Sequence, residues 1–287
     1  MTIVGRVLEV WRYPVKSMGG ESLNAASFGP LGIPGDRGWA LRDEAAGEMR
    51  GAKKLPVLMR CKARYDREPA DGAVPPVTMT LPDGSSVHSG DADVSARLSA
   101  LTGRSVTLWP LQPPESTDHY RRGLPDNPDM EAELRQMFGR LPDEPLPDLS
   151  AIPPELFEYT SPLGTHFDLF PLHLLTTASL RTLAAKTPGA AFDVRRFRPN
   201  LLIEPSDGAD GLVEAGWCGK TLRIGSAVVS IAMPAMRCSM TTHAVDELPK
   251  DPSVLRTIVR DANQNLGVYA TVSQAGAVRV GDTVEID

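Results

Sequence analysis

Short runs of alternating apolar and polar residues, separated by glycine-containing turns, constrain the fold of this chain most strongly. The run IVGRVLEVW at residues 3–11, for example, is rich in Val and Ile and alternates between the two kinds of side chain. Side chains of a β-strand point alternately to its two faces, so this pattern is typical of a strand with one buried face. Many such strands with tight turns predict a β-barrel or sandwich, mainly β with some helices (α+β). The other strand-like runs are residues 22–28, 37–41, 60–65, 200–204, 221–224, 227–233, 267–272 and 283–286.

Turn and cap residues add a hairpin and several helices to this pattern. LPDGSSV places Asp83 and Gly84 where a hairpin turn needs residues that accept positive φ. Helix starts and stops are predicted from Asp and Thr at N-caps and from Gly at C-termini. The expected helices cover residues 91–101 (N-cap Asp91 or Asp93, closed by Gly103), 129–140, 177–186 (N-cap Thr176 or Thr177) and 253–261.

The composition changes sharply at residue 112. Residues 112–162 are dense in Pro, Asp and Glu, as in PDNPD and LPDEPLPDLS, and such a composition disfavours a packed core. We therefore expect a domain over residues 1–111, a Pro-rich insert or linker over residues 112–162, and a second domain over residues 163–287. The middle part can be a disordered linker or an ordered lid over a cleft, and the sequence favours neither.

Net charge and hydropathy argue against two classes of partner, nucleic acids and membranes. Its formal net charge of −6 argues against a nucleic-acid binder, which needs a basic face to neutralise phosphates. No run approaches the roughly 18 apolar residues of a membrane-spanning helix, and the N-terminus carries charges too early for a secretory signal. We therefore expect a cytoplasmic protein that acts on a small molecule, with no nucleic-acid or membrane partner.

The cysteines, histidines and missing motifs exclude several kinds of site. Cys61, Cys218 and Cys238 are odd in number and widely spaced, unlike a disulfide framework. No CxxC pair is present for a zinc ribbon or an iron–sulfur cluster. The histidines show no metal-ligand spacing, and His173, in the apolar run FPLHLL, is expected in the core. The sequence also lacks GxGxxG, GxxxxGK[ST] and HExxH motifs, so it shows no nicotinamide, flavin or nucleotide site of its own.

Cys238 is the strongest candidate for a reactive group. It lies in MPAMRCSMTT, after the strand-like run at residues 227–233 and beside Arg237. A neighbouring cation favours the thiolate form of a cysteine, and a thiolate is a soft donor suited to molybdenum or copper(I). A free cysteine is more commonly buried and inert, so the local sequence leaves both interpretations open.

Several basic residues stand where strands begin or end and can bind an anion. In RFRPN, Arg196 and Arg198 occupy alternate positions before a strand, and guanidinium groups suit phosphate. Lys16 and Ser17 in YPVKS end the first strand, and Arg37 follows a turn rich in Gly and Pro. Surface salt bridges would explain such residues too, so the anion site is one of two open interpretations.

Together these motifs resemble one family. YPVKS, a GxxxDR motif at residues 32–37 and the following GWAL are similar to the N-terminal β-barrel domain that precedes MOSC domains. The resemblance covers nearly the whole chain apart from residues 112–162. It implies a mainly β protein, with an N-terminal β-barrel-like domain followed by a MOSC β-barrel domain. The motifs similar to the MOSC domain itself are FRPN at 197–200, LRIG at 222–225, MRC at 236–238, TT at 241–242 and VRVGD at 278–282.

The resemblance also implies a molybdenum cofactor, in which a pyranopterin dithiolene and a protein cysteine bind the metal. Cys238 matches the position of that cysteine, and Asp168 matches an acidic, catalytic position near the metal. Because the cofactor is anionic, basic and polar positions of the family hold its pterin and phosphate. The matching residues here are Lys16, Ser17, Arg37, Arg198 and Asn200, with Arg237 as a further contact beside the cysteine.

The chain departs from the eukaryotic amidoxime-reducing relatives at three positions. Leu169 and Phe170 follow Asp168 where those relatives carry a Thr-Ser pair, and Met236 stands where they have a serine. Each change removes a hydroxyl group. We therefore expect a more apolar pocket with fewer hydroxyl contacts to the cofactor.

The resemblance implies a reductase of N-hydroxylated compounds such as amidoximes and hydroxylamines. Its electrons would come from a partner redox protein, because the sequence shows no dinucleotide, flavin or cluster motif. Two other functions stay open. The MOSC domain of cofactor sulfurases suggests a sulfur carrier with a persulfide on Cys238, and a cofactor-binding module without catalysis is also compatible with these motifs.

Overall fold

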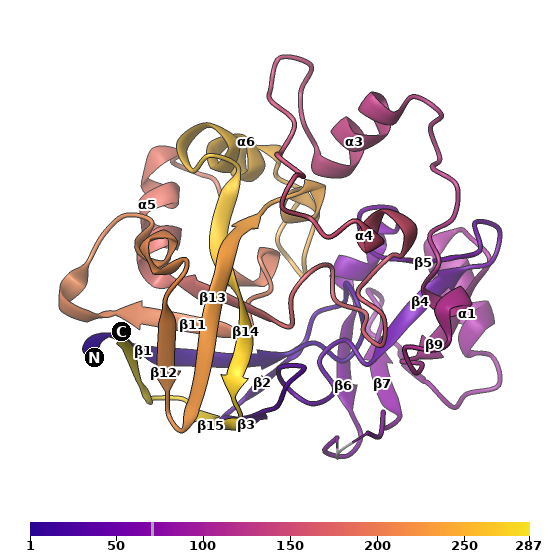
Figure 1. Cartoon of the computed structure of the whole chain (residues 1–287). Coiled ribbons are helices and arrows are strands. Elements are labelled where there is room, and N and C mark those ends of the chain that lie inside the picture. The colour runs from indigo at the N-terminus through magenta and orange to yellow at the C-terminus, as the bar shows by residue number, and fades with distance from the viewer. Residues whose placement is uncertain (70–71) are drawn as a thin grey trace.

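A seven-stranded barrel is built from the first strand and from strands of the second half of the chain. The computed structural model describes residues 1–69 and 72–287, in which strands are more numerous than the six α-helices (Figure 1). The barrel order is β11-β10-β14-β13-β12-β16-β1, and β1 closes it by pairing with β11. The expected class, mainly β with some helices, is confirmed. The barrel strands are β1 (Thr2–Arg12), β10 (Leu172–Thr176), β11 (Leu201–Pro205), β12 (Thr221–Ile224), β13 (Ala227–Met236), β14 (Asn265–Gln274) and β16 (Thr283–Ile286).

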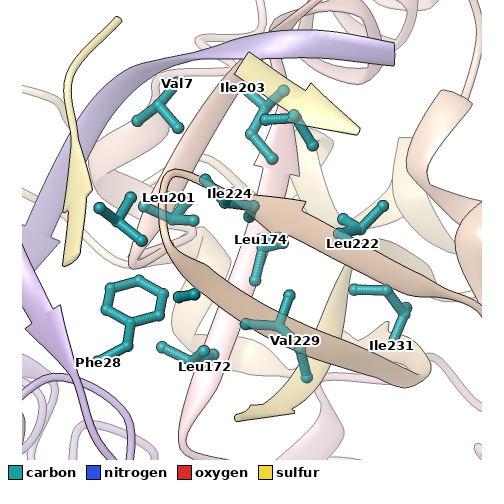
Figure 2. Packing of buried hydrophobic residues seen from close by; sticks show 14 of the residues in the cluster. Val7, Phe28, Leu172, Leu174, Leu201, Ile203, Leu222, Ile224, Val229 and Ile231 are labelled. Carbon is teal, nitrogen blue, oxygen red and sulfur yellow. The ribbon is translucent and has the colours of Figure 1, made fainter. Parts of the chain in front are cut away.

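The barrel closes around aliphatic side chains. Buried and more exposed residues alternate along β1, and its Val7 and Val10 point into the core. Leu174 of β10 and Val229 of β13 are fully buried in the same cluster. Full burial of such a side chain contributes ~1.5–3 kcal/mol, so the strands that lead to the site are held from inside the barrel. Figure 2 shows this cluster, with Val7, Phe28, Leu172, Leu174, Leu201, Ile203, Leu222, Ile224, Val229 and Ile231 labelled.

The first strand lies in the barrel formed by the second half of the chain. β1 runs antiparallel between β11 and β16, and β2 (Glu21–Leu23) extends the sheet beyond it. β3 (Ala25–Phe28) pairs instead with β15 (Gly276–Arg279). The run expected as one strand over residues 22–28 is therefore two short strands with different partners. The expected division of the chain near residue 111 stays a prediction.

Two three-stranded sheets make up the rest of the N-terminal half, in the orders β5-β4-β9 and β6-β7-β8. The predicted hairpin joins β7 and β8, with Gly84 at a φ of 84°, and is confirmed. The strand expected over residues 37–41 begins only at Trp39, because Arg37 lies in a turn with a φ of 55°. The elements are β4 (Trp39–Asp43), β5 (Glu48–Arg50), η1 (Pro56–Arg60), β6 (Lys62–Tyr65), β7 (Val77–Thr80), β8 (Ser86–His88), α1 (Val94–Thr102) and β9 (Val106–Pro110).

Two helices pack against the outside of the barrel, and Phe197 lies in the apolar cluster that they form with it. The side chain of Thr176 caps α5 (Thr177–Lys186), as predicted, and that of Asp251 caps α6 (Pro252–Asp261). These oxygens accept hydrogen bonds from amides that have no partner within the helix. Apolar residues of both helices pack around Phe197 outside the barrel. The 3-10 turns of this half are η2 (Val194–Arg196), η3 (Ser206–Gly208), η4 (Val213–Trp217) and η5 (Ser239–Thr242).

Residues 112–162 contact both halves of the molecule. Lys54 of the N-terminal half forms an ion pair with Asp126 at 3.1 Å, and Arg140 donates a hydrogen bond to Gln264 Oε1, near α6, at 2.9 Å. In Figure 1 the segment crosses the upper part of the view between the purple sheets and α6. Its helices are α2 (Thr117–Tyr120), α3 (Met130–Phe138) and α4 (Glu155–Glu158). No helix among residues 1–69 and 72–287 has the length and apolarity needed to cross a membrane.

Candidate functional site

A pocket of about 150 Å³ lies between the end of β13, the residues that precede β10, and segment 112–162. Six of the predicted site residues line it, although they come from distant parts of the sequence. The other two, Lys16 and Ser17, do not line the pocket but are hydrogen-bonded to residues at its edge: Lys16 to Asp168, and Ser17 to Ala52, which precedes Lys53. The six lining residues are Arg37, Asp168, Arg198, Asn200, Arg237 and Cys238.

Cys238 lies two residues after the end of β13 and is the N-cap residue of η5. Its backbone is extended, and its carbonyl accepts hydrogen bonds from Thr241 N at 3.2 Å and Thr241 Oγ1 at 3.0 Å. The cysteine is free and half-buried, so its thiol is accessible from the pocket. The threonine, part of the TT motif, therefore fixes the turn that presents the thiol.

Lys16 and Asp168 form an ion pair at the pocket edge. Lys16 Nζ donates hydrogen bonds to Asp168 Oδ1 at 2.8 Å and to His166 O at 2.7 Å. Desolvation by the pocket walls would raise the pKa of Asp168, whose side chain is still 50% exposed, but the charges of Lys16 and Lys53 outweigh it and hold that pKa well below its usual range. Asp168 is therefore an ionised carboxylate at neutral pH.

Arg37 and Arg198 converge on one aromatic ring. Their guanidinium carbons lie 5.3 Å and 4.2 Å from the centroid of Tyr13. Both residues adopt the left-handed region of backbone conformation, with φ of 55° and 53°, which is uncommon for residues other than glycine and is enriched at functional sites. Arg37 pairs with Asp36.

Arg198 is a buried cation with a donor left free. Its Nη1 is buried and has no hydrogen-bond partner in the part of the chain that the structure describes. Burial, together with the nearby charge of Arg37, lowers the pKa of Arg198 to about 10. It still carries its charge at neutral pH. An unpaired buried cation is costly unless a ligand compensates it, so this position suits an anion.

Arg196, in contrast, is used by the protein itself. Its guanidinium donates hydrogen bonds to Ala191 O at 3.0 Å, His243 O at 2.7 Å and Pro249 O at 2.7 Å. The two arginines of RFRPN therefore do not act as a pair on one anion. Arg196 holds the surrounding loops, and only Arg198 offers free donors.

Asn200 and Ser17 join the segments that surround the pocket. Asn200 Oδ1 accepts a hydrogen bond from His173 N at 3.0 Å, and its Nδ2 donates to Asp36 Oδ2 at 3.0 Å. Ser17 Oγ accepts a hydrogen bond from Ala52 N at 2.8 Å. These contacts fix the loops that carry Arg37 and Lys53, whatever further contact the two side chains make with a cofactor.

Arg237 lies beside Cys238 and is only partly satisfied by the protein. Its Nη2 donates to Phe197 O at 3.0 Å, and its Nη1 lies 3.5 Å from His173 Nε2. Its Nε is buried with no partner among the described residues. His173 itself is buried next to Leu266 O, at 3.3 Å, as expected of a core histidine.

The sequence interpretation missed Lys53, Tyr269, Phe138 and Ile152, which also line the pocket. Burial alone would lower the pKa of Lys53, but the nearby carboxylate of Asp168 is the largest of the influences that raise it. No motif marks GAKKLP, so only the folded chain brings this lysine to the site. The two apolar residues come from segment 112–162, for which the sequence left a disordered linker and a lid over a cleft both open.

Apolar side chains form much of the remaining wall. Leu169, Phe170 and Met236, the three departures from the amidoxime-reducing relatives, all line the pocket. The rings of Phe170 and Tyr269 are stacked with centroids 5.6 Å apart. A substrate would therefore meet aromatic and thioether groups close to the polar residues.

The charges and the donor set define the class of ligand. Arg37, Lys53, Arg198 and Arg237 face a pocket in which Asp168 is the one carboxylate among the lining residues that the structure describes. Free donors on Arg198 and Arg237 suit phosphate and other anionic groups. A thiol in the same pocket suits a soft metal. The residues would thus fit an anionic, metal-carrying cofactor, and the fold itself is that of a closed β-barrel protein.

Comparison with known families agrees with this class. The model described as MOSC domain matches residues 165–285, and the model described as MOSC N-terminal beta barrel domain matches residues 4–112. Together the two models account for most of the chain on both sides of the Pro-rich segment. The chain belongs to the MOSC-domain proteins that carry this N-terminal domain.

Its curated relatives cover nearly the whole chain at low identity. The chain is 26% identical to mitochondrial amidoxime reducing component 2 of Homo sapiens, over 98% of its own length and 83% of the relative's. The same values hold for mitochondrial amidoxime reducing component 2 of Rattus norvegicus. Among solved structures, the YUAD protein from Bacillus subtilis is 13% identical, with a TM-score of 0.44 over 99% of this chain and 96% of that one.

Proposed function

We propose that this protein is a molybdenum-cofactor-dependent reductase of N-hydroxylated compounds, supplied with electrons by a partner redox protein. The buried, unpaired guanidinium of Arg198 in the same pocket as Cys238 is the observation that carries the proposal. It supports an anionic ligand next to a thiol, which is what this cofactor requires. The names of the curated relatives support the reaction class.

Each residue has a role in holding the cofactor. Cys238 would supply the protein thiolate to the metal, and Arg198 and Arg237 would donate hydrogen bonds to the anionic pterin and phosphate. Arg37 adds a further charge beside Tyr13. When bound, the cofactor supplies a metal that accepts oxygen and passes electrons. Lys16, Ser17 and Asn200 hold the surrounding turns and complete the proposed contact set.

Proton supply falls to the Lys16–Asp168 pair. Reduction of an N-hydroxyl group to water consumes protons as well as electrons. Lys16 Nζ lies 2.8 Å from Asp168 Oδ1 at the pocket edge, so the pair can hold a proton next to a bound substrate. Burial lowers the pKa of Lys16, partly offset by Asp168, which makes the ammonium a better proton donor than an exposed lysine.

The apolar wall suits an uncharged organic substrate, and the acidic chain supports the expectation that nucleic acid is not a partner. A cytoplasmic location, and a division into residues 1–111, 112–162 and 163–287, belong to the same proposal. The curated relatives, in contrast to the cytoplasmic location proposed here, carry the word mitochondrial in their names.

Turnover of an amidoxime by protein made in a cofactor-producing host tests the function. With a reduced dye as electron source, we expect wild-type protein to form the amidine and Cys238→Ala to be inactive. Molybdenum-loaded protein without turnover would instead support a binding module. Molybdenum-free protein with a persulfide on Cys238 would support a sulfur carrier.

A further inference from the structure

We propose that Phe138 determines which substrates this pocket accepts, and that Arg140 is the positioning residue that holds Phe138 against the loop of Cys238. The inference rests on the proposed function, and goes beyond it by assigning substrate selection to segment 112–162. It concerns two residues of a Pro-rich segment to which neither family model extends.

Phe138 is the last residue of α3 and a half-buried wall of the pocket. Ile152 of the same segment lines the pocket as well. An aromatic ring that is half-buried at a pocket wall offers a large apolar surface with few rotatable bonds. Such a surface can contact the organic part of a substrate at low entropic cost.

The end of α3 cannot shift away from the site without losing close packing. Gly139 follows Phe138 with a φ of 63° and ends the helix. A Cβ atom at Gly139 would lie 2.8 Å from Leu255 Cδ2 and 3.2 Å from Ser239 Cα. The backbone therefore packs directly on α6 and on the residue after Cys238, where only glycine fits.

Arg140 joins this helix end to the cysteine loop. Its buried guanidinium donates hydrogen bonds to Phe138 O at 2.5 Å from Nη1 and to Arg237 O at 3.0 Å from Nη2. Ser239 Oγ adds a hydrogen bond to Met137 O at 2.9 Å. Both neighbours of Cys238 in the sequence are thus bonded to residues 137–140. Phe138 and the loop of Cys238 are therefore joined by hydrogen bonds into one structural unit.

Phe138 is joined to a different part of the pocket wall from Arg37 and Arg198, the two arginines beside Tyr13. Arg37 and Arg198 stack on Tyr13, whose hydroxyl donates a hydrogen bond to Pro199 O at 2.9 Å. Phe138 is connected to the residues on either side of the thiol instead. If the metal sits at the thiol and the phosphate at the arginines, the group that Phe138 meets is the substrate.

The test compares two substrates with the same reacting group. Benzamidoxime carries a phenyl ring where acetamidoxime carries a methyl group. In Phe138→Ala we expect kcat/KM for benzamidoxime to fall about tenfold or more, and kcat/KM for acetamidoxime to stay within about twofold. Phe157→Ala is the matched control, because Phe157 is 61% exposed in the same segment and does not line the pocket.

Binding of the products gives a readout that does not depend on turnover. We expect Phe138→Ala to weaken the Kd of benzamidine about tenfold and that of acetamidine little. Arg140→Lys should lose the same preference for the aromatic compounds, because a lysine cannot donate in three fixed directions. It should also make Cys238 react faster with iodoacetamide in cofactor-free protein, whereas Phe138→Ala should change this rate less.

The outcomes separate the two proposals. A wild-type protein that reduces neither amidoxime would overturn the proposed function, and this inference with it. Turnover of both compounds, with an unchanged ratio in Phe138→Ala and unchanged amidine binding, would overturn the inference alone. An unchanged ratio and unchanged iodoacetamide rate in Arg140→Lys would remove Arg140 from the positioning role.

Discussion

Arg196 and Arg198 are separated by one residue and are both buried, yet their surroundings give them opposite roles. Each donor group of Arg196 binds a backbone carbonyl, whereas Arg198 Nη1 has no partner among the described residues. At the residue scale, this contrast separates a side chain whose donors are all used within the fold from one that keeps a donor available for the proposed ligand.

Alanine at the two positions should therefore give opposite results. Arg196→Ala leaves three carbonyls without donors and should lower the free energy of unfolding by about 2–4 kcal/mol. Arg198→Ala removes an unpaired buried charge, so it should change stability by less than about 1 kcal/mol while lowering molybdenum content strongly. Chemical denaturation and metal analysis measure the two effects. Equal destabilisation by both variants, with full molybdenum in each, would contradict the assignment.

The sequence marked most of the polar residues that line the pocket, but only some of the apolar ones. Cys238, Asp168 and Arg198 follow from motifs, because family resemblance marks short polar stretches at strand ends. Phe138 and Lys53 lie in stretches without a motif and reach the pocket only through tertiary packing. The free donor of Arg198, as opposed to the satisfied ones of Arg196, depends on loop carbonyls distant in sequence, so spacing alone cannot distinguish the two.

At the scale of elements, helix caps show how local sequence and tertiary structure share control. Asp251 accepts a hydrogen bond from Ser253 N at 3.0 Å, at the start of α6. Asp93, one of the two caps predicted for α1, makes no side-chain cap hydrogen bond, although Gly103 closes that helix with a φ of 68° as predicted. The sequence predicted both helices, but it could not show whether the aspartate before each helix accepts a hydrogen bond from the first turn.

Replacing these two aspartates with alanine tests the difference. We expect Asp251→Ala to lower the free energy of unfolding by about 1 kcal/mol, and Asp93→Ala by less than half as much. Urea denaturation of the two variants beside the wild type measures this. A loss at Asp93 as large as that at Asp251 would show that the cap of α1 forms in solution.

A buried histidine pair joins segment 112–162 to the residues before Asp168. His119 Nε2 and His166 Nε2 lie 3.1 Å apart, and His166 Nδ1 lies 3.2 Å from Arg37 O. Burial, helped by the charge of Arg42, lowers the pKa of His119 to about 4. Burial lowers the pKa of His166 well below its ordinary value too, with a contribution from Lys16. Both rings are neutral in the folded protein at neutral pH.

This pair should make the protein less stable in mild acid. Between the ordinary histidine pKa of about 6.5 and the lowered value of about 4, the unfolded chain binds protons that the folded protein does not, so stability falls as the pH falls. We expect the free energy of unfolding to be lower at pH 5 than at pH 7.5, with His119 contributing about 1 kcal/mol after allowance for solvent screening. In His119→Gln the difference between the two pH values should shrink. An unchanged difference would mean that other groups control the acid response.

At the scale of the whole molecule, the sequence predicted the class of fold. It did not predict that the first strand of the chain pairs with strands of the C-terminal half. Alternating patterns indicated most barrel strands, including β1. They could not indicate that β1 closes the barrel of the second half by pairing with β11 and β16. Partner choice between strands depends on contacts between distant residues, as in Val10 with Leu201, 191 positions apart, and Thr2 with Ile286, 284 positions apart. Local patterns carry no information on it.

The electron supply is also a property of the whole molecule. The sequence shows no dinucleotide, flavin or cluster motif, so we expect the purified protein not to oxidise NAD(P)H in the presence of an amidoxime. Turnover should appear when a small redox protein and its reductase are added, through the weak contact that is usual for such donors. NADPH consumption with and without these proteins measures this. Rapid consumption by the lone protein would reveal a cofactor site that the sequence does not show.

Metal analysis is the most direct test of whether Cys238 binds the molybdenum of a cofactor in this pocket. The protein is made in a cofactor-producing host and analysed for molybdenum and phosphorus beside Cys238→Ala and Cys218→Ser, the latter being a free, half-buried cysteine outside the pocket. We predict stoichiometric molybdenum and phosphorus in the wild type and in Cys218→Ser, and a strong loss of molybdenum in Cys238→Ala without a loss of folding. Wild-type protein without molybdenum, or full molybdenum retained in Cys238→Ala, would contradict the account.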